Sequence, residues 1–216
     1  MVAAVIFDLD GVLVDSEQVW ARVRRAYALD RGGRYPDEAD RAMQGMSSLE
    51  WSRYMRDELG VPLEPSAISA EVADLVAREY HRALPLLPGA VDAVRGLASR
   101  WPLGLASSAN RSLIDLVLRD SGLGACFAAT VSSEEVPRGK PAPDVYLEAA
   151  GRLGVDPASC AAVEDSSNGL RSAAAAGMRV VAVPNRAYPP ADDALALAGV
   201  VLDGVAELTP SVVASL

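Results

Sequence analysis

The sequence predicts an α/β protein built on a doubly wound, parallel β-sheet, with an all-helical domain inserted after the first strand. Three observations lead to this prediction. Short apolar runs recur along most of the 216 residues, segments with helical spacing lie between these runs, and the alternation breaks between residues 16 and 84. A chain of this length can form one buried core together with a small inserted domain.

The predicted strands are apolar runs that are nearly continuous and do not alternate with polar residues. This pattern is typical of parallel strands, because helices on both faces of such a sheet bury both sets of side chains. The runs cover residues 3–9, 102–106, 129–131, 160–163, 179–183 and 200–202.

The predicted helices of the sheet-forming part lie between these runs and carry Leu, Val or Ala at helical spacing. They cover residues 90–100, 111–121, 144–153 and 168–176. Gly122, Gly154 and Gly177 stand just after three of them, where helices commonly end. The alternation of strands and helices is typical of a doubly wound α/β core.

Residues 16–84 contain no convincing strand. Their helical stretches cover residues 17–29, 48–59 and 70–83. We interpret this segment as an all-helical domain, with one joint near Asp15 and the other at residues 84–89. The core is then formed by residues 1–15 and 85–216.

The composition limits the partners of the protein. The formal net charge is -9, so we expect no binding to nucleic acid or to anionic membranes. A small anionic substrate stays compatible with this charge, because a local site can be positive on an acidic protein. No apolar run reaches the length of a membrane-spanning helix. We expect a monomer.

The two cysteines and the N-terminal segment indicate the cellular compartment. Cys126 and Cys160 show no metal-type spacing, and two residues do not make a disulfide framework. We expect free thiols, as in a reducing cytoplasm. The first apolar run has no basic region before it and reaches an acid at Asp8, which argues against a signal peptide. These features predict a cytoplasmic protein.

Two carboxylates, Asp8 and Asp10, end the first apolar run. Side chains two positions apart on an extended chain share a face, and ligands of open α/β sheets bind at the carboxyl ends of the strands. The pair therefore predicts a ligand site at this edge of the sheet. The alternative is a solvated strand end with an aspartate that caps the next helix, and the pair alone leaves both open.

Two later segments add groups that suit phosphate. Ser107, Ser108 and Asn110 follow the second apolar run, where a hydroxyl and the amides that enter a helix can hold a phosphate oxygen, although serine and asparagine are also ordinary helix caps. Lys140 is the single lysine among 20 cationic residues and lies in a loop with two prolines. A compact point charge on a stiff loop suits phosphate binding.

Glu164 and Asp165 follow the apolar run at residues 160–163. Together with Asp8 and Asp10 they would place four carboxylates on one rim of the sheet. Such a group repels itself strongly unless a cation lies among its members. Mg²⁺, which prefers oxygen ligands, is the natural candidate.

These four segments resemble the signature motifs of the haloacid dehalogenase superfamily, in order, and the resemblance covers nearly the whole chain. The helical insertion resembles the cap domain of the subfamily that includes β-phosphoglucomutase and phosphoglycolate phosphatase. The resemblance implies a Rossmann-like core, a helical cap and Mg²⁺-dependent phosphoryl transfer.

The resemblance also implies a role for each core residue. Asp8 would be the nucleophile that forms an aspartyl phosphate, and Asp10 the general acid and base. Ser107 and Lys140 would orient the phosphate and offset its charge. The implied metal ligands are the Asp8 carboxylate, the backbone carbonyl of Asp10, Asp165 and, beside it, Glu164.

Further substrate contacts are implied from both sides of the site. In the insertion, Gln44, Gly45 and Ser48 resemble the loop of the cap that faces the substrate, with a plain turn before a helix as the alternative. On the core side, the expected contacts are Ser107, Ser108, Asn110 and Lys140.

The resulting hypothesis is a phosphatase that acts on a small phosphorylated metabolite such as a sugar phosphate. The alternative is a phosphomutase of the β-phosphoglucomutase type. That mutase has a histidine where Trp20 stands here and an arginine for its second phosphate where Ser48 stands, so hydrolysis is favoured. Arg53, Arg78 and Arg82 lie in the insertion, but the sequence does not show whether their side chains point toward the site.

Two further functions are disfavoured. Haloacid dehalogenases need no metal and replace the second acid of the first motif, whereas Asp10 and the pair Glu164 and Asp165 are all present here. A non-catalytic binding protein would not need this complete set of reactive residues.

Overall fold

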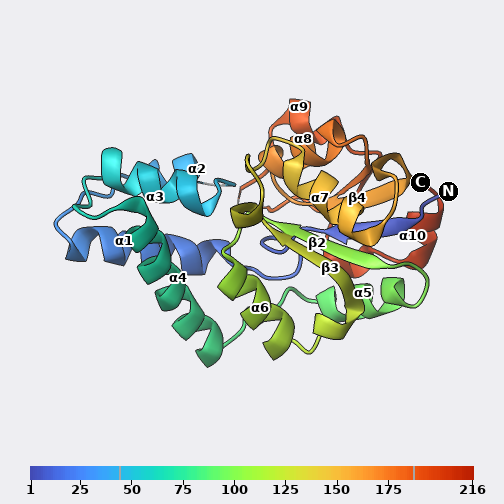
Figure 1. Ribbon diagram of the computed structural model, residues 1–216, viewed down its shortest axis with the longest axis horizontal. Helices are drawn as coiled ribbons and strands as arrows, with labels where there is room; N and C mark the ends of the chain where they lie inside the picture. Colours follow the sequence, from blue (N-terminus) through green and yellow to red (C-terminus); the bar gives the residue numbers. More distant parts are fainter. Residues whose placement is uncertain (44, 187) are drawn as a thin grey trace.

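The computed structural model of the chain describes residues 1–43, 45–186 and 188–216. Gln44, which the sequence places in the loop facing the substrate, lies outside the described residues. The centre of the structure is a six-stranded parallel sheet in the order β3-β2-β1-β4-β5-β6 (Figure 1). The strands are β1 (Ala4–Phe7), β2 (Leu103–Ser107), β3 (Phe127–Ser132), β4 (Cys160–Glu164), β5 (Arg179–Ala182) and β6 (Val200–Val201).

The first strand lies in the middle of the sheet, between β2 and β4. Phe7, its last residue, is aligned with Leu105 on one side and with Val163 on the other. Because the three strands are parallel and in register, the residues that follow them meet at one edge. This alignment brings Asp8 close to the segments that begin at Ser107 and Glu164.

Two separate hydrophobic cores form on the two faces of the sheet. Val5 and Phe7 of β1 point into one core, and Ala4 and Ile6 into the other, as the period of two in a strand requires. The helices α5 (Ala90–Ala98) and α6 (Arg111–Asp120) lie on the first face, and α7 (Asp144–Leu153) and α8 (Ser167–Ala175) on the second (Figure 1). The prediction of a doubly wound α/β core is confirmed.

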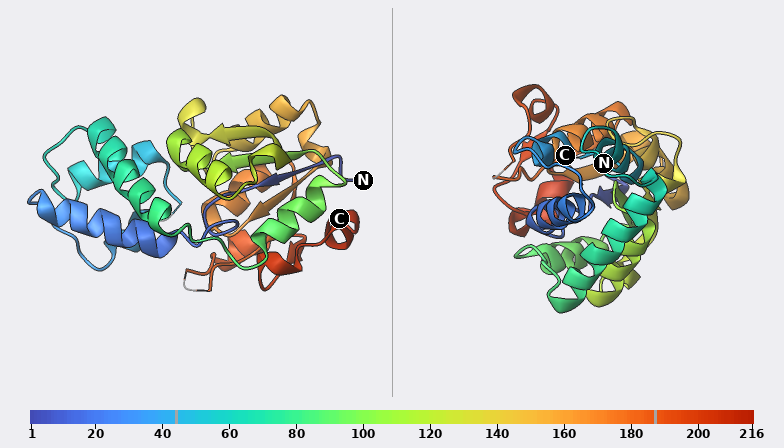
Figure 2. Two further views of the ribbon diagram at one scale, coloured as in Figure 1. Left: turned by 90° about the horizontal axis from the view of Figure 1, so that it is seen from below. Right: turned by 90° about the vertical axis from the view of Figure 1, so that its left-hand side faces the viewer.

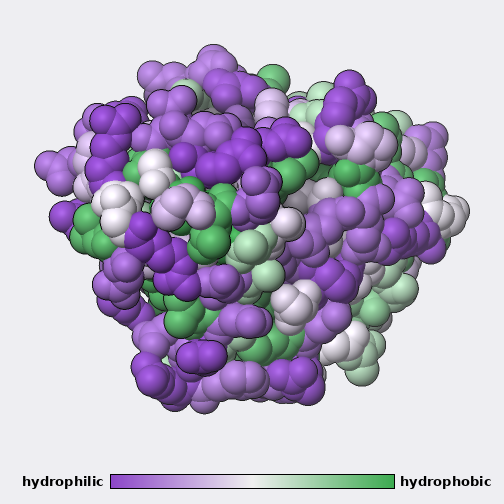
Figure 3. All heavy atoms as spheres, turned by 60° about the vertical axis from the view of Figure 1, so that its left-hand side comes forward, coloured by the Kyte–Doolittle hydropathy of each residue, from purple (hydrophilic) through white to green (hydrophobic). Residues whose placement is uncertain are grey.

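Four helices follow β1 before the chain returns to the sheet. They are α1 (Glu17–Asp30), α2 (Ala39–Met43), α3 (Ser48–Asp57) and α4 (Pro65–Arg82), here called the inserted helices. They gather at the end of the molecule opposite to both termini (Figures 1 and 2). The face that they present in Figure 3 is mostly hydrophilic, with small hydrophobic areas between polar side chains.

The two chain segments that join the inserted helices to the sheet run side by side. The backbone N–H of Asp15 donates to the carbonyl of Pro85 at 2.7 Å, and that of Leu87 donates to the carbonyl of Leu13 at 2.9 Å. These hydrogen bonds hold the two connections next to each other.

Some elements differ from the sequence prediction. Helix α4 begins at Pro65, five residues before the predicted start at residue 70, because proline suits the first turn of a helix. Strand β3 begins two residues earlier than predicted. The short helices α2, α9 (Asp192–Leu195) and α10 (Pro210–Ala214) were not predicted, since one turn of helix shows no periodicity. In the described part of the chain, no helix combines the length and apolar character needed to cross a membrane.

The return to the sheet depends on a glycine in a left-handed conformation. Gly89 precedes α5 with φ +82°, and a Cβ atom there would lie 2.6 Å from Cβ of Ala206. Gly122 also has a positive φ, +67°, but nothing lies within 4 Å of its Cβ position. The two glycines therefore share the backbone constraint and differ in the space around them.

We predict that Gly122→Ala lowers the free energy of unfolding by about 1–2 kcal/mol, from backbone strain alone. Gly89→Ala should lose about 1–3 kcal/mol more, because the added methyl group overpacks against Ala206. Urea unfolding of both variants measures the difference, provided that the m-value does not change. Equal losses would show that Ala206 moves away at no cost.

Candidate active site

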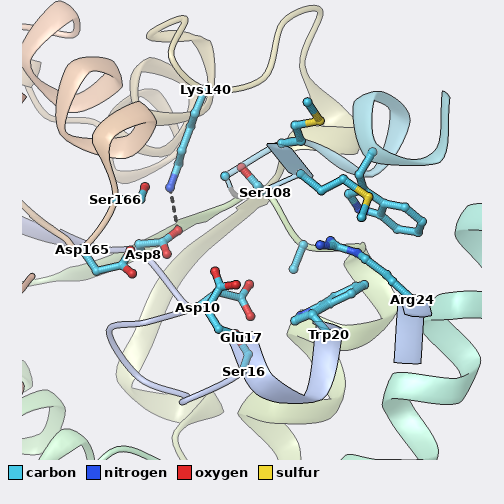
Figure 4. A pocket seen from close by; sticks show the side chains of 15 residues that line it. Asp8, Asp10, Ser16, Glu17, Trp20, Arg24, Ser108, Lys140, Asp165 and Ser166 are labelled. Atoms are coloured by element: carbon cyan, nitrogen blue, oxygen red, sulfur yellow. Dashed lines mark hydrogen bonds and ion pairs between the residues drawn. The ribbon is translucent and has the colours of Figure 1, made fainter. Parts of the chain in front are cut away.

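The residues that follow β1, β2 and β4 meet around a buried lysine. Lys140 Nζ donates to Asp8 Oδ1 at 2.6 Å (Figure 4) and to Glu164 Oε1 at 2.6 Å. All three side chains are buried, and Asp165, which lies beside Asp8, is buried with them. The single lysine of the sequence thus joins two acids that are 156 residues apart in the chain.

Glu164 is held by donors on both of its carboxylate oxygens. Besides Lys140, the hydroxyl of Tyr146 donates to Oε1 at 2.8 Å, and the backbone N–H groups of Asp165 and Ser166 donate to Oε2 at 3.1 and 3.4 Å. Sequence analysis did not identify Tyr146, because an aromatic residue on the apolar face of a helix is usually a core residue. Its ring centroid lies 5.0 Å from Lys140 Nζ.

The charges of this cluster do not balance. One carboxylate oxygen from each of Asp8, Glu164 and Asp165 lies within 4.8 Å of the others, and Lys140 forms ion pairs with Asp8 and Glu164. The pKa of Asp8 is raised to about 8, mainly by burial, with smaller contributions from Glu164 and Asp10 and against the opposing effect of Lys140. Burial, Glu164 and Asp8 together raise the pKa of Asp165 well above its ordinary value. Three oxygen donors with excess negative charge fit a hard divalent cation.

Asp10 is not a member of this carboxylate cluster and lies between Asp8 and Glu17 (Figure 4). Its side chain points into the cavity beside Glu17 (Figure 4). Burial raises the pKa of Asp10, while the side chains of Ser16 and Trp20 lower it. A carboxyl group with a raised pKa that faces a cavity can hold a proton and deliver it to a ligand.

The segment after β2 presents one of the two predicted serines to the cavity. Ser108 lines the cavity, and its buried Oγ has no hydrogen-bond partner among the described residues. Ser107 is fully buried behind it, and its Oγ accepts a hydrogen bond from the backbone N–H of Ala109 at 3.0 Å. The hydroxyl of Ser108 is therefore the one that faces the space in front of Asp8.

Two other predicted substrate contacts lie outside this cavity. Asn110 Nδ2 donates to Ser69 of α4 at 3.0 Å and to Glu134 at 2.7 Å, so it links the inserted helices to the core. Ser48 lies with Asn110 along a separate groove, whereas Gly45 lines the cavity beside Asp8.

The cavity wall opposite the carboxylates comes from the inserted helices. Four of its members come from α2, α3 and the turn between them, and they are Met43, Gly45, Met46 and Trp51. The others are Ser16, directly before α1, and Glu17, Trp20 and Arg24, which lie on one face of α1. Their spacing in α1 predicts a common face, but which face meets the core depends on the packing of all four helices.

The cluster depends on a close approach between α8 and Glu164. A Cβ atom at Gly169 would lie 1.9 Å from the carboxyl atoms of Glu164. Gly151 of α7 is also helical, but nothing lies within 4 Å of its Cβ position. The two positions share a helical backbone and differ only in what they contact.

We predict opposite effects of alanine at these two positions. Gly151→Ala should raise the free energy of unfolding by about 0.5–1 kcal/mol, the usual gain in a helix. Gly169→Ala should lower it by about 2–4 kcal/mol, because Glu164 must leave its donors. Thermal and urea unfolding provide the measurement. A stabilised Gly169→Ala variant would contradict the proposed packing.

Comparison with known proteins identifies the family. A family model described as haloacid dehalogenase-like hydrolase matches residues 2–177. The chain is 36% identical to hexitol phosphatase B of Escherichia coli (strain K12) over 217 residues, covering 96% of this chain and 95% of the relative.

Solved structures share the fold along nearly the whole chain. CbbY from Rhodobacter sphaeroides, solved in complex with phosphate, is 27% identical and superposes with a TM-score of 0.84 over 96% of each chain. A β-phosphoglucomutase from Clostridium difficile, 23% identical, has the same fold, with a TM-score of 0.86 over 100% of this chain and 96% of the other. The family model and the identity to a full-length relative agree with the arrangement of the site: the chain belongs to the haloacid dehalogenase-like hydrolase family.

Proposed function

We propose that the protein is a Mg²⁺-dependent phosphatase that hydrolyses a small phosphorylated metabolite of the sugar-phosphate type through a phospho-Asp8 intermediate. The observation that carries the proposal is the buried group of Asp8, Lys140, Glu164 and Asp165 at a cavity that also holds Asp10. Relatives named as phosphatases, hexitol phosphatase B among them, support this reaction class.

In the first step, an oxygen of the Asp8 carboxylate forms a bond to phosphorus, and the bond between phosphorus and the leaving alcohol breaks. Asp10 donates its proton to the leaving oxygen, a role that suits its raised pKa. Lys140 holds Asp8 in place through a 2.6 Å hydrogen bond and offsets negative charge.

In the second step, Asp10 accepts a proton from water as the water oxygen bonds to phosphorus. The bond between phosphorus and Asp8 then breaks, which releases inorganic phosphate and restores both carboxyl groups. The Ser108 hydroxyl, which faces the cavity, would orient a phosphate oxygen, and the role of Ser107 in binding phosphate stays a prediction from the sequence.

The residues present fit a bound Mg²⁺. Asp8 and Asp165 would hold it with the backbone carbonyl of Asp10, and Glu164 would contribute from beside them. When bound, Mg²⁺ would neutralise charge on the phosphoryl oxygens.

We infer that residues 16–84 act as a cap over this site. The cavity between the inserted helices and the sheet edge measures about 60 Å³, room for on the order of five water molecules. A sugar phosphate is larger than this enclosed space, and an outward movement of the inserted helices would enlarge it. The paired connections at Leu13–Asp15 and Pro85–Leu87 are the natural hinge, and closure then excludes bulk water.

We predict that Asp8→Asn abolishes release of inorganic phosphate from a panel of sugar phosphates assayed with Mg²⁺. The loss of kcat should be on the order of 10³-fold or more, because the nucleophile is removed. Asp92→Asn, at an exposed position of α5, is the matched control and should keep its activity. Substantial turnover by Asp8→Asn would rule out the covalent mechanism.

The same panel separates hydrolysis from mutase activity. With β-glucose 1-phosphate and a bisphosphate primer, the proposal expects inorganic phosphate to form faster than glucose 6-phosphate. The reverse order would make the protein a phosphomutase.

We predict that Mg²⁺ stabilises the protein more as the pH rises. The pKa of Asp8 in the folded protein, about 8, exceeds its ordinary value of about 4. The folded state therefore binds more protons than the unfolded state within this window, and the metal-free protein loses stability as the pH rises through it. Mg²⁺ replaces the proton and removes this loss.

Melting temperatures between pH 5.5 and 8.5, with and without Mg²⁺, check this prediction. The shift produced by Mg²⁺ should grow with pH, and Asp165→Asn, which lacks one of the proposed ligands, should reduce it. A shift that is the same at every pH would contradict the coupling between proton and metal.

A further inference from the structure

A buried arginine faces the cavity from the inserted helices. Arg24 of α1 is 8% exposed, and its guanidinium carbon lies 4.6 Å from the ring centroid of Trp20 and 4.8 Å from that of Trp51. The two indole rings also contact each other, with centroids 5.7 Å apart and an interplanar angle of 61°. In Figure 4 the guanidinium group lies over Trp20 and points toward the middle of the cavity.

Arg24 forms no ion pair closer than 4.0 Å in the described part of the chain, although Glu17 and Asp10 of the same cavity favour its positive charge from farther away. Its Nε is buried and makes no hydrogen bond to the described residues. Arg31, seven residues later, also contacts an aromatic ring, that of Tyr27 at 3.9 Å, but it forms an ion pair with Glu71. A buried charge without a direct hydrogen-bonded partner is costly, and aromatic rings and more distant carboxylates compensate only part of that cost.

A purely structural role does not explain this arrangement. An arginine that only fills space between two tryptophans need not line the cavity that holds Asp8 and Asp10, yet Arg24 does. Burial lowers the pKa of Arg24, but a guanidinium group stays protonated in proteins. A cation therefore persists on the cavity wall opposite the carboxylate cluster.

The other arginines expected as candidates from the sequence do not face this cavity. Arg78 and Arg82 line a groove on the outer side of α1 and α4, and Arg82 is paired with Glu79. Arg53 lines the groove that contains Ser48. Among the described residues of the inserted helices, Arg24 is the cation that lines the cavity.

We propose that Arg24 binds a second anionic group of the substrate, so that the substrates are phosphomonoesters whose leaving group carries a carboxylate or another phosphate. The planar guanidinium group can bind either anion through two parallel hydrogen bonds. Trp20 and Trp51 restrict its orientation. This inference rests on the proposed function and narrows its substrate class.

The test compares substrates that differ only in the second anion. The carboxylate pair is 6-phosphogluconate and glucitol 6-phosphate, and the phosphate pair is glucose 1,6-bisphosphate and glucose 1-phosphate. The protein should prefer the anionic member of at least one pair by 10-fold or more in kcat/KM. Arg24→Met should lower kcat/KM for that member on the order of 10- to 100-fold, which corresponds to the loss of a hydrogen bond to a charged group. The ratio of kcat/KM between the two members of the pair should then move toward one.

Two further variants separate recognition from packing. Arg31→Met removes a cation that also contacts an aromatic ring but lies away from the cavity, and it should leave the ratio unchanged. Arg24→Lys keeps the charge without the planar fork and should give an intermediate ratio, even if Arg24→Met folds poorly. No preference in either pair, or an equal loss for both members in Arg24→Met, would overturn the inference.

Binding to the Asp8→Asn variant keeps this inference distinct from the proposed reaction. Calorimetry with Mg²⁺ and the same four compounds should show the same preference, weakened at least 10-fold by adding Arg24→Met. Preferential binding without any turnover in the native protein would keep the role of Arg24 and refute hydrolysis. Turnover without preferential binding would support hydrolysis and refute the role of Arg24.

Discussion

The contact of Lys140 with Asp8 and Glu164 is the constraint on which the rest of the site depends. It ties a loop to the ends of two neighbouring strands, and all three groups are buried. Burying charges is favourable only when each is paired and hydrogen-bonded, and here the acids still outnumber the cation. The fold therefore retains an excess of negative charge beside the nucleophile, which a divalent cation can neutralise. Tyr146 and the backbone N–H groups after β4 complete the shell of donors around Glu164.

The parallel sheet explains why these groups meet. Because β1 lies between β2 and β4 and in register with both, three loops from distant parts of the chain open at the same edge. The helix that follows β4 approaches so closely that only glycine fits at position 169. Packing between α8 and β4 thus restricts the position of the Glu164 carboxylate.

The two parts of the cavity wall have different roles in the proposed reaction. The sheet edge supplies groups that react with or neutralise a phosphoryl group, whereas α1 and the following helices supply aromatic side chains and Arg24. The first part depends on short, rigid loops after buried strands. The second belongs to the proposed cap, so changes in that wall can alter the leaving group that is accepted without disturbing the nucleophile.

The sequence by itself determined the alternation of strands and helices, the helical insertion and the carboxylates at the strand ends, since all of these follow from local periodicity and short motifs. It also singled out Lys140 as the exceptional cation. Only the tertiary structure decided that Tyr146 and Lys140 donate hydrogen bonds to Glu164, that Asn110 contacts Ser69, and that Arg24 faces the cavity. Periodicity tells which residues share a helical face, but the neighbour that this face meets is set by packing between segments far apart in the chain.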